Sequence, residues 1–455
     1  MRSVRHFWPD LTPESDRLPD TRYAPLIRYH KRFLLWWGLL LFCLKLGSRR
    51  QLDYQLRDLE LQVLANVNRL AGTAQDSLPV NKTLDHFLGH VGARPLAALR
   101  TWLVRRLIRM RALDDCRLLG RFVLAVDGSG FLHFHQPHCA HCLTQKRDSQ
   151  TLYLHPVLEA KLVDTSGLAL SIGTEFIENP WADRHDHPRR APTVKDYETI
   201  KQDCELKAFR RLAPELKRAF PQLAVCIGGD SLLACGPVFC ICEDYHWAYV
   251  LTFKAGRTPE LWDEFRRLLK LVPENRRRLK LPDDTRQLYR WVNDLDYVDS
   301  EGHAHCFDAI LCVETAPDGQ STTYAWISAF HVTAQNVVAI AEQGGRNRWK
   351  IENQGFNTQK NSGLNLTHAY SIDPENFKAF YYLLQCAHIL LQMFEHGSLL
   401  AHLAQQYGQQ TARHLFGSLA NLAQFLRDCF RYFRLTNEAF DHQAAAHCHI
   451  ALNSS

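Results

Sequence analysis

The sequence predicts an α/β protein whose sheet-forming centre lies between α-helical N- and C-terminal parts. Three observations predict this class. Residues 1–121 show the apolar periodicity of helices, residues 122–254 hold short β-type runs with one amphipathic helix among them, and the chain returns to helical periodicity beyond residue 332. Strand-like runs within 255–331 predict a β-rich insertion between the two parts of the centre. The length of 455 residues suits about three structural units.

The N-terminal part, residues 1–121, contains helical patterns at 53–64 and 96–121. A twelve-residue apolar run at 33–44 is too short to cross a bilayer and predicts a buried helix. In the centre, 122–254, the expected strands are 122–126, 153–164, 168–172, 224–227 and 248–253, with a helix at 199–220 before the fourth strand.

The insertion, 255–331, begins with a basic helical piece. Strands are expected at 307–314 and 323–330, joined by a turn at 317–319. The second part of the centre, 332–400, and the C-terminal region, 401–455, are expected to be helical at 336–353, 376–396, 399–407 and 412–433. The tail beyond residue 435 carries little pattern, so we expect it to be loosely ordered.

Composition indicates the cellular compartment of the protein more clearly than its chemistry. The net charge of +6 is too small to indicate a polyanionic partner by itself. The 14 cysteines are scattered in apolar contexts and do not show the regular spacing of a secreted disulfide scaffold. With no signal peptide and no membrane span expected, the sequence indicates a soluble cytoplasmic protein.

Three acidic residues occupy positions suited to chemistry. Asp127 in FVLAVDGSG and Asp230 in LAVCIGGDS each follow an apolar strand and stand beside glycine, and Glu352 lies in the helical run RNRWKIENQGFNTQK. Carboxylates at strand ends project into the crevice where open α/β sheets bind ligands. Carboxylate oxygens suit Mg²⁺ or Mn²⁺, and a pair of such ions could serve phosphodiester chemistry. The alternative is that the aspartates cap turns and that Glu352 forms a surface pair with Arg348.

In order and spacing, these acids resemble the catalytic triad of DDE-type bacterial transposases, specifically the insertion-sequence-four-like group. The likeness covers about residues 30–400, and its most specific parts are HCAHC (138–142), KQDCE (201–205) and IENQGFNTQKN (351–361). It implies an RNase H-like catalytic core with Asp127, Asp230 and Glu352 as metal ligands. It also implies cleavage of element ends and strand transfer into target double-stranded DNA by a homodimer.

The sequence departs from the signature of that group in two places. Arg348 and Glu352 match, but Gly345 stands where the group has tyrosine. Gln359 stands where the group has lysine, and Lys360 follows one position later. The chain therefore resembles an outlying subgroup or a decayed copy.

A run of histidines and cysteines, HFHQPHCAHC, indicates a second metal site. Cys139 and Cys142 have half the spacing of a structural zinc site, and His138 adjoins them. Cys204 and His155 could complete the ligand set, of which we expect Cys204; the pair Cys240 and Cys242 is a weaker choice. The alternative is a polar loop with two buried thiols.

Two stretches concentrate positive charge. Residues 94–121 hold eight arginines against two acids, and residues 266–280 hold seven bases against one acid. Such stretches neutralise phosphates, although many charged runs are only solvated faces. The candidate DNA-binding residues are Arg105, Arg106, Arg109, Arg276, Arg277, Arg278, Arg348, Lys350 and Lys360. Trp291 in the insertion is a candidate for stacking on a flipped base, as the resemblance implies, and the alternative is that it is an aromatic residue of the core.

Two other functions remain open from sequence. One is a DNA-binding derivative of such a transposase that has lost catalysis. The other is a zinc-dependent hydrolase built on the histidines and cysteines, with the acids as capping residues.

Overall fold

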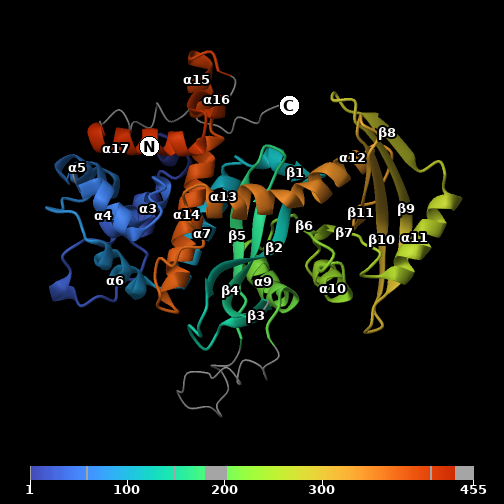
Figure 1. The fold of residues 1–455 in the computed structure, drawn as a ribbon, viewed down its shortest axis with the longest axis horizontal. Coiled ribbons are helices and arrows are strands. Elements are labelled where there is room, and N and C mark those ends of the chain that lie inside the picture. Colours follow the sequence, from blue (N-terminus) through green and yellow to red (C-terminus); the bar gives the residue numbers. More distant parts are fainter. Residues whose placement is uncertain (1, 58–59, 148–149, 180–201, 410–411, 436–455) are drawn as a thin grey trace, which may run out of the picture.

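The computed structural model describes residues 2–57, 60–147, 150–179, 202–409 and 412–435. The described part is a mixed α/β structure built on one long sheet, in the strand order β3-β4-β2-β6-β7-β11-β10-β9-β8, with β1 paired to β2 and β5 paired to β4. Figure 1 shows the N-terminal helices at one end of the molecule, the centre of the sheet in the middle and the insertion at the other end. The predicted α/β class is confirmed.

Helices make up nearly all of the N-terminal part. They are α1 (Arg2–Phe7), α2 (Leu11–Ser15), α3 (Lys31–Cys43), α4 (Arg49–Arg57), α5 (Glu60–Ala71), α6 (Asn81–Val91) and α7 (Ala93–Arg109). The apolar run at 33–44 forms the buried helix α3, as predicted.

The helix predicted at 96–121 is wrong in its second half. Helix α7 ends at Arg109, because Arg111 takes a left-handed backbone conformation (φ 58°) and the N–H of Ala112 donates to the carbonyl of Leu107. The apolar periodicity continues past this stop through Leu113 and Leu118, so the pattern alone does not show it.

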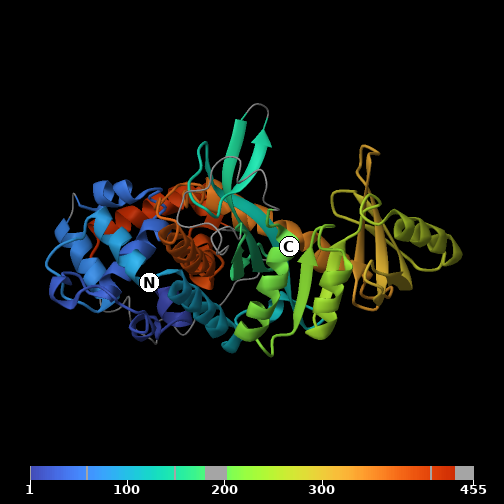
Figure 2. The same cartoon turned by 90° about the horizontal axis from the view of Figure 1, so that it is seen from below.

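The centre contains the strands expected from sequence, most of them longer than the patterns indicated. They are β1 (Arg117–Leu118), β2 (Arg121–Phe134), β3 (Leu143–Arg147), β4 (Gln150–Val163), β5 (Ala169–Phe176), β6 (Val225–Gly229) and β7 (Ala248–Thr252), with helices α9 (Glu205–Ala219) and α10 (Gly236–Asp244). Strands β5, β4 and β2 are antiparallel neighbours, whereas β2, β6 and β7 run parallel. Figure 2 shows the β3–β4 hairpin standing out from the body.

The insertion continues the same sheet. It consists of α11 (Pro259–Leu271), β8 (Arg276–Lys280), β9 (Arg286–Val298), β10 (Ala304–Thr315) and β11 (Ser321–Ser328). Its last strand pairs with the last strand of the centre, Trp326 opposite Thr252 and Ser328 opposite Val250. The predicted β-rich insertion is therefore an extension of the central sheet, and its basic arginine run lies on the edge strand β8.

A helical rod then returns from the insertion across the sheet (Figure 1). It starts as α12 (Val337–Ala339), passes through π-helical Ile340–Gly345, 3₁₀-helical Arg346–Arg348 and π-helical Ile351–Asn357, and ends as α13 (Thr358–Asn361). π-Helical turns are uncommon and occur often at functional sites. This rod carries Glu352.

The chain ends in helices that pack back on the N-terminal part. They are α14 (Asn376–Glu395), α15 (Ser398–Gln406), α16 (Ala412–Phe416) and α17 (Leu419–Tyr432). Helix α14 is buried along most of its length and packs on α3, α6 and α7, so one hydrophobic core continues from the N-terminal helices into the sheet. The single helix expected at 412–433 is broken at Gly417 (φ 73°).

Both faces of the sheet are covered near β4. Glu159 accepts a hydrogen bond from Tyr381 of α14. The next residue of β4, Ala160, pairs with Gly173, and Gly173 lies against Leu216 of α9. Adjacent residues of a strand point to opposite faces, so α14 and α9 lie on opposite sides of the sheet. The predicted tail beyond 435 and the first residues of the helix predicted at 199–220 fall outside the described residues. Among the residues that are described, no helix combines the length and apolar character needed to cross a membrane.

Candidate active site

The two aspartates lie on adjacent parallel strands at matching positions. Strands β2 and β6 pair in register from Phe122 opposite Val225 to Ala125 opposite Gly228. Asp127 and Asp230 each follow the last of these pairs by two residues, so the register places them side by side, with their side chains on one face of the sheet. The backbone N–H of Gly128 donates to the Asp127 carboxylate at 3.0 Å, and that of Leu232 donates to the Asp230 carboxylate at 2.8 Å.

Glu352 joins this pair through an arginine. The Arg348 Nη1 atom donates to Glu352 Oε1 at 2.7 Å and to Asp127 Oδ2 at 3.3 Å. The guanidinium is only 10% exposed, and the side chains of Asp127 and Glu352 are 18% and 43% exposed. The structure thus brings together three acids that are more than a hundred residues apart in sequence.

At Asp127, burial together with the neighbouring carboxylates outweighs the effect of the arginine on the pKa. Burial raises the pKa of Asp127 to about 7; Arg348 opposes this rise, and the nearby Glu352 and Glu205 carboxylates add to it. Burial also raises the pKa of Glu205, with a further contribution from Asp230. A group of acids held together at this electrostatic cost is what a cation-binding site requires.

Glu205 is a fourth acid that sequence reasoning did not assign. It is the first residue of α9, and its side chain fills the space that a Cβ on Gly128 would occupy. The close approach explains why glycine follows Asp127 in the VDGSG motif. An available signal was the acid in KQDCE at the start of an amphipathic helix, but nothing in the sequence relates its position to that of Asp127.

The two departures from the transposase signature have structural explanations. Lys360 contacts the VDGSG motif that contains Asp127, since its Nζ donates to Ser129 Oγ at 2.7 Å. Burial lowers the pKa of Lys360. Gln359 points the other way, is fully buried and donates to Gln385 Oε1 at 2.8 Å. At Gly345, the indole of Trp326 occupies the space where a larger side chain would begin.

Several predicted DNA-binding residues are exposed, but others have structural roles. Arg109, Arg276 and Arg278 are exposed, and Lys350 is half-buried near Glu352. Arg277 donates to the carbonyl of Gln335, and Arg106 pairs with Asp10 at 3.8 Å.

Two residues of this set are corrected by the structure. Arg105 donates to the Ala219 carbonyl at the end of α9, so it caps that helix. Trp291 is 4% exposed in the middle of β9, and a buried indole is not available to stack on a base. Trp349, which sequence reasoning did not single out, is 55% exposed beside Arg348.

The histidine and cysteine cluster forms with one ligand different from the expected set. His138, Cys139 and Cys142 gather with His155 of β4, and their candidate ligand atoms all lie within 4.8 Å of one another. Cys204 is exposed, precedes α9 and does not belong to the group. His155 is distant from the motif in sequence, but the pairing of β3 and β4 brings it beneath the loop.

The sequence matches no model of a known protein family and no curated protein.

Proposed function

We propose that the protein is a metal-dependent DNA transposase that cleaves the ends of an insertion sequence and joins them to target DNA. The observation that carries the proposal is the convergence of the three acids over the central strands β2 and β6: strand register sets Asp127 beside Asp230, and Arg348 links Asp127 to Glu352. The resemblance of the sequence to DDE transposases supports the same three residues.

The topology agrees with an RNase H-like core. The strand order β5-β4-β2-β6-β7, antiparallel in the first half and parallel in the second, with α9 before β6, is the arrangement that such a core requires. The acids lie where strands β2 and β6 meet, and Glu352 comes from a helix that crosses this face (Figure 1). This is the distribution of acids expected of a DDE enzyme.

The donor set fits Mg²⁺ or Mn²⁺. Asp127, Asp230 and Glu352 provide carboxylate oxygens, and Glu205, which interacts electrostatically with Asp127 and Asp230, is a further carboxylate beside them. When bound, one or two such ions would activate water and stabilise the leaving oxygen of a phosphodiester.

The protein side chains position DNA and balance charge. Arg348 keeps Asp127 and Glu352 close to each other while the site is free of substrate. Lys360, held at Ser129, offers a positive charge to a DNA phosphate beside the acids. Water cleaves the element end to leave a 3′-hydroxyl and a 5′-phosphate. That hydroxyl then attacks a target phosphodiester, so that the element 3′ end is joined to the target 5′-phosphate and a target 3′-hydroxyl is released. Joining two ends requires two such sites, so the active form is a homodimer on double-stranded DNA.

The zinc-hydrolase alternative finds less support. Four protein ligands would complete a tetrahedral shell, whereas a catalytic zinc site keeps one position open for water or substrate. The remaining alternative is a DNA-binding protein without catalysis, which differs from our proposal because it would not cleave DNA.

The test uses a supercoiled plasmid that carries the coding sequence with its natural flanking DNA. The protein is added with Mg²⁺, and nicked, linear and joined products are resolved on gels. We expect Asp127→Asn, Asp230→Asn and Glu352→Gln each to reduce cleavage by about 10²-fold or more while leaving DNA binding in place.

The matched control is Asp318→Asn, which removes an exposed carboxylate in the β10–β11 turn, remote from the acids. It should cleave as the unaltered protein does. DNA binding without cleavage by the unaltered protein would favour the inert derivative and overturn the proposal, as would full activity of the Asp127→Asn variant.

A further inference from the structure

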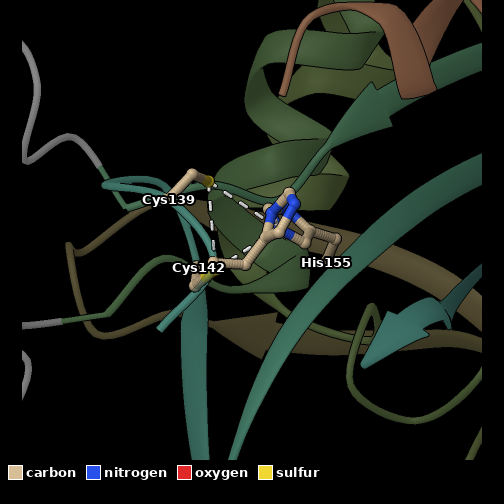
Figure 3. Close-up of side chains that lie close together, drawn as sticks. Cys139, Cys142 and His155 are labelled. Carbon is tan, nitrogen blue, oxygen red and sulfur yellow. Dashed lines mark hydrogen bonds between the residues drawn. The ribbon is translucent and has the colours of Figure 1, made fainter. Parts of the chain in front are cut away.

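The loop between β2 and β3 folds over the start of β4 and brings two histidines and two cysteines together. His138, Cys139 and Cys142 come from the loop, and His155 comes from β4. Figure 3 shows the two thiols and the His155 ring directed at one another. Cys142 and His155 are buried at 0% and 1% exposure, so the centre of the group is shielded from solvent.

The distances within the group match the edges of a coordination tetrahedron. Zinc bonds of about 2.3 Å to sulfur and about 2.05 Å to nitrogen place ligand atoms about 3.8 Å (S to S), 3.6 Å (S to N) and 3.3 Å (N to N) apart. The Sγ atoms of Cys139 and Cys142 are 3.9 Å apart. His155 Nε2 lies 3.7 Å from Cys139 Sγ, 3.3 Å from Cys142 Sγ and 3.3 Å from His138 Nδ1.

The surroundings of the group suit metal ligation. His138 turns Nδ1 toward the group while its Nε2 lies 2.7 Å from the carbonyl of Ile372, the backbone partner that fixes the orientation of many metal-bound histidines. The ring of Phe134 stacks on His138 at a centroid distance of 4.1 Å. The sulfur atoms are too far apart for a disulfide, whose S–S bond is about 2.05 Å.

A second group in the described residues is a poorer candidate. Cys240, Asp299 and His305 provide three donors, and His305 Nδ1 already pairs with Glu243 Oε1 at 2.9 Å. It has three donors, one fewer than the first group.

We propose that His138, Cys139, Cys142 and His155 bind one Zn²⁺ ion as a closed, structural site. The site shares no ligand with the carboxylates and is a second, separate metal centre. Because both cysteines and His138 belong to one loop, the ion would fasten that loop to β4 and, through His138, to the segment before α14.

The site also reaches the start of α9 through hydrogen bonds. Asn179 donates to the carbonyl of Cys142 at 2.8 Å and accepts from the N–H of Asp203 at 3.2 Å. Gln202 pairs with both backbone groups of Thr144, two residues beyond Cys142, at 2.6 and 3.0 Å. Asp203 lies two residues before Glu205, so the loop that zinc would hold positions the segment that presents the fourth acid.

The experiment measures zinc in the full-length protein by mass spectrometry after expression in zinc-supplemented medium. We expect about one zinc per chain in the unaltered protein and a loss of about 10-fold or more in Cys142→Ser and His155→Ala. Cys204→Ser is the matched control, since this cysteine is exposed and lies outside the group; it should keep about one zinc per chain.

Cobalt provides a second readout on the unaltered chain, in case a variant does not fold. Protein stripped with a chelator and reconstituted with Co²⁺ should show the visible absorption of a tetrahedral ion with two thiolate ligands. Absence of zinc and of this spectrum in the unaltered protein would overturn the proposal, as would loss of zinc from Cys204→Ser. Neither result depends on DNA cleavage, so the zinc proposal and the transposase proposal fail separately.

Discussion

Replacing Asp127 by asparagine should make the metal-free protein more stable. Burial raises the pKa of this carboxyl from an ordinary value of 3.8 to about 7. The folded protein therefore binds the proton more tightly than the unfolded chain does. It follows that the ionised Asp127 carboxylate lowers the free energy of unfolding above pH 7. This destabilisation disappears as the pH falls toward 4.

The size of the effect follows from the shift. A change from 3.8 to about 7 corresponds to about 4 kcal/mol at pH 8, at about 1.4 kcal/mol per pH unit. Asparagine keeps the shape without the charge, but it loses the bond from Arg348. We expect a net gain of about 2 kcal/mol in the free energy of unfolding at pH 8, and almost none at pH 4.

The assay is thermal unfolding in EDTA at both pH values, followed by titration with Mg²⁺. At pH 8 the variant should unfold a few degrees higher than the unaltered protein. Added Mg²⁺ should raise the midpoint of the unaltered protein and leave that of Asp127→Asn nearly unchanged, because a ligand stabilises only the form that binds it. Asp318→Asn serves as the control for a carboxylate outside the site.

The opposite result would refute the reasoning. If Asp127 acts only as a turn cap through its bond from the N–H of Gly128, Asp127→Asn should leave the midpoint in EDTA nearly unchanged at both pH values, because asparagine caps about as well as aspartate. A midpoint that is not raised at pH 8, together with equal responses to Mg²⁺, would show that the acids do not form a cation site.

Five further variants test the other assignments. Glu205→Gln should weaken Mn²⁺ binding about 10-fold in calorimetry, and unchanged affinity would remove Glu205 from the site. Gln359→Ala should reduce stability by about 1–3 kcal/mol in urea unfolding because it leaves buried partners unpaired. Lys360→Ala should leave stability nearly unchanged and weaken DNA binding. Loss of stability in Lys360→Ala and loss of DNA binding in Gln359→Ala would contradict their positions in the structure. Arg105→Ala should lower the unfolding midpoint without changing the salt dependence of DNA binding, since this arginine caps α9. Arg109→Ala should lower the slope of log affinity against log salt by about 1 if Arg109 contacts a phosphate, and an unchanged slope would exclude that contact.

Local sequence patterns were sufficient to predict features that depend only on residues close together in the chain. An unbroken apolar run predicts that α3 is buried. Apolar runs that end in Asp and Gly predict strands that end at Asp127 and Asp230. This is correct for β6, which ends at Gly229, but wrong for β2, which continues through Asp127 to Phe134 because its pairing with β4 does not stop at the acid. The α/β class therefore follows from sequence, whereas the assignment of the three acids stays a prediction.

Only the tertiary structure decided which residues meet. Strand register places Asp127 beside Asp230, the extension of the sheet through β11 and β7 carries the helical rod back over them, and the turn from β3 into β4 brings His155 beneath Cys142. These contacts span tens to hundreds of residues and depend on register and helix winding, which local periodicity does not encode. Glu205 was therefore visible in the sequence only as a residue, and its neighbours were defined by the fold. His155 was one of two residues that the sequence offered to complete the ligand set, and the fold favours it over Cys204.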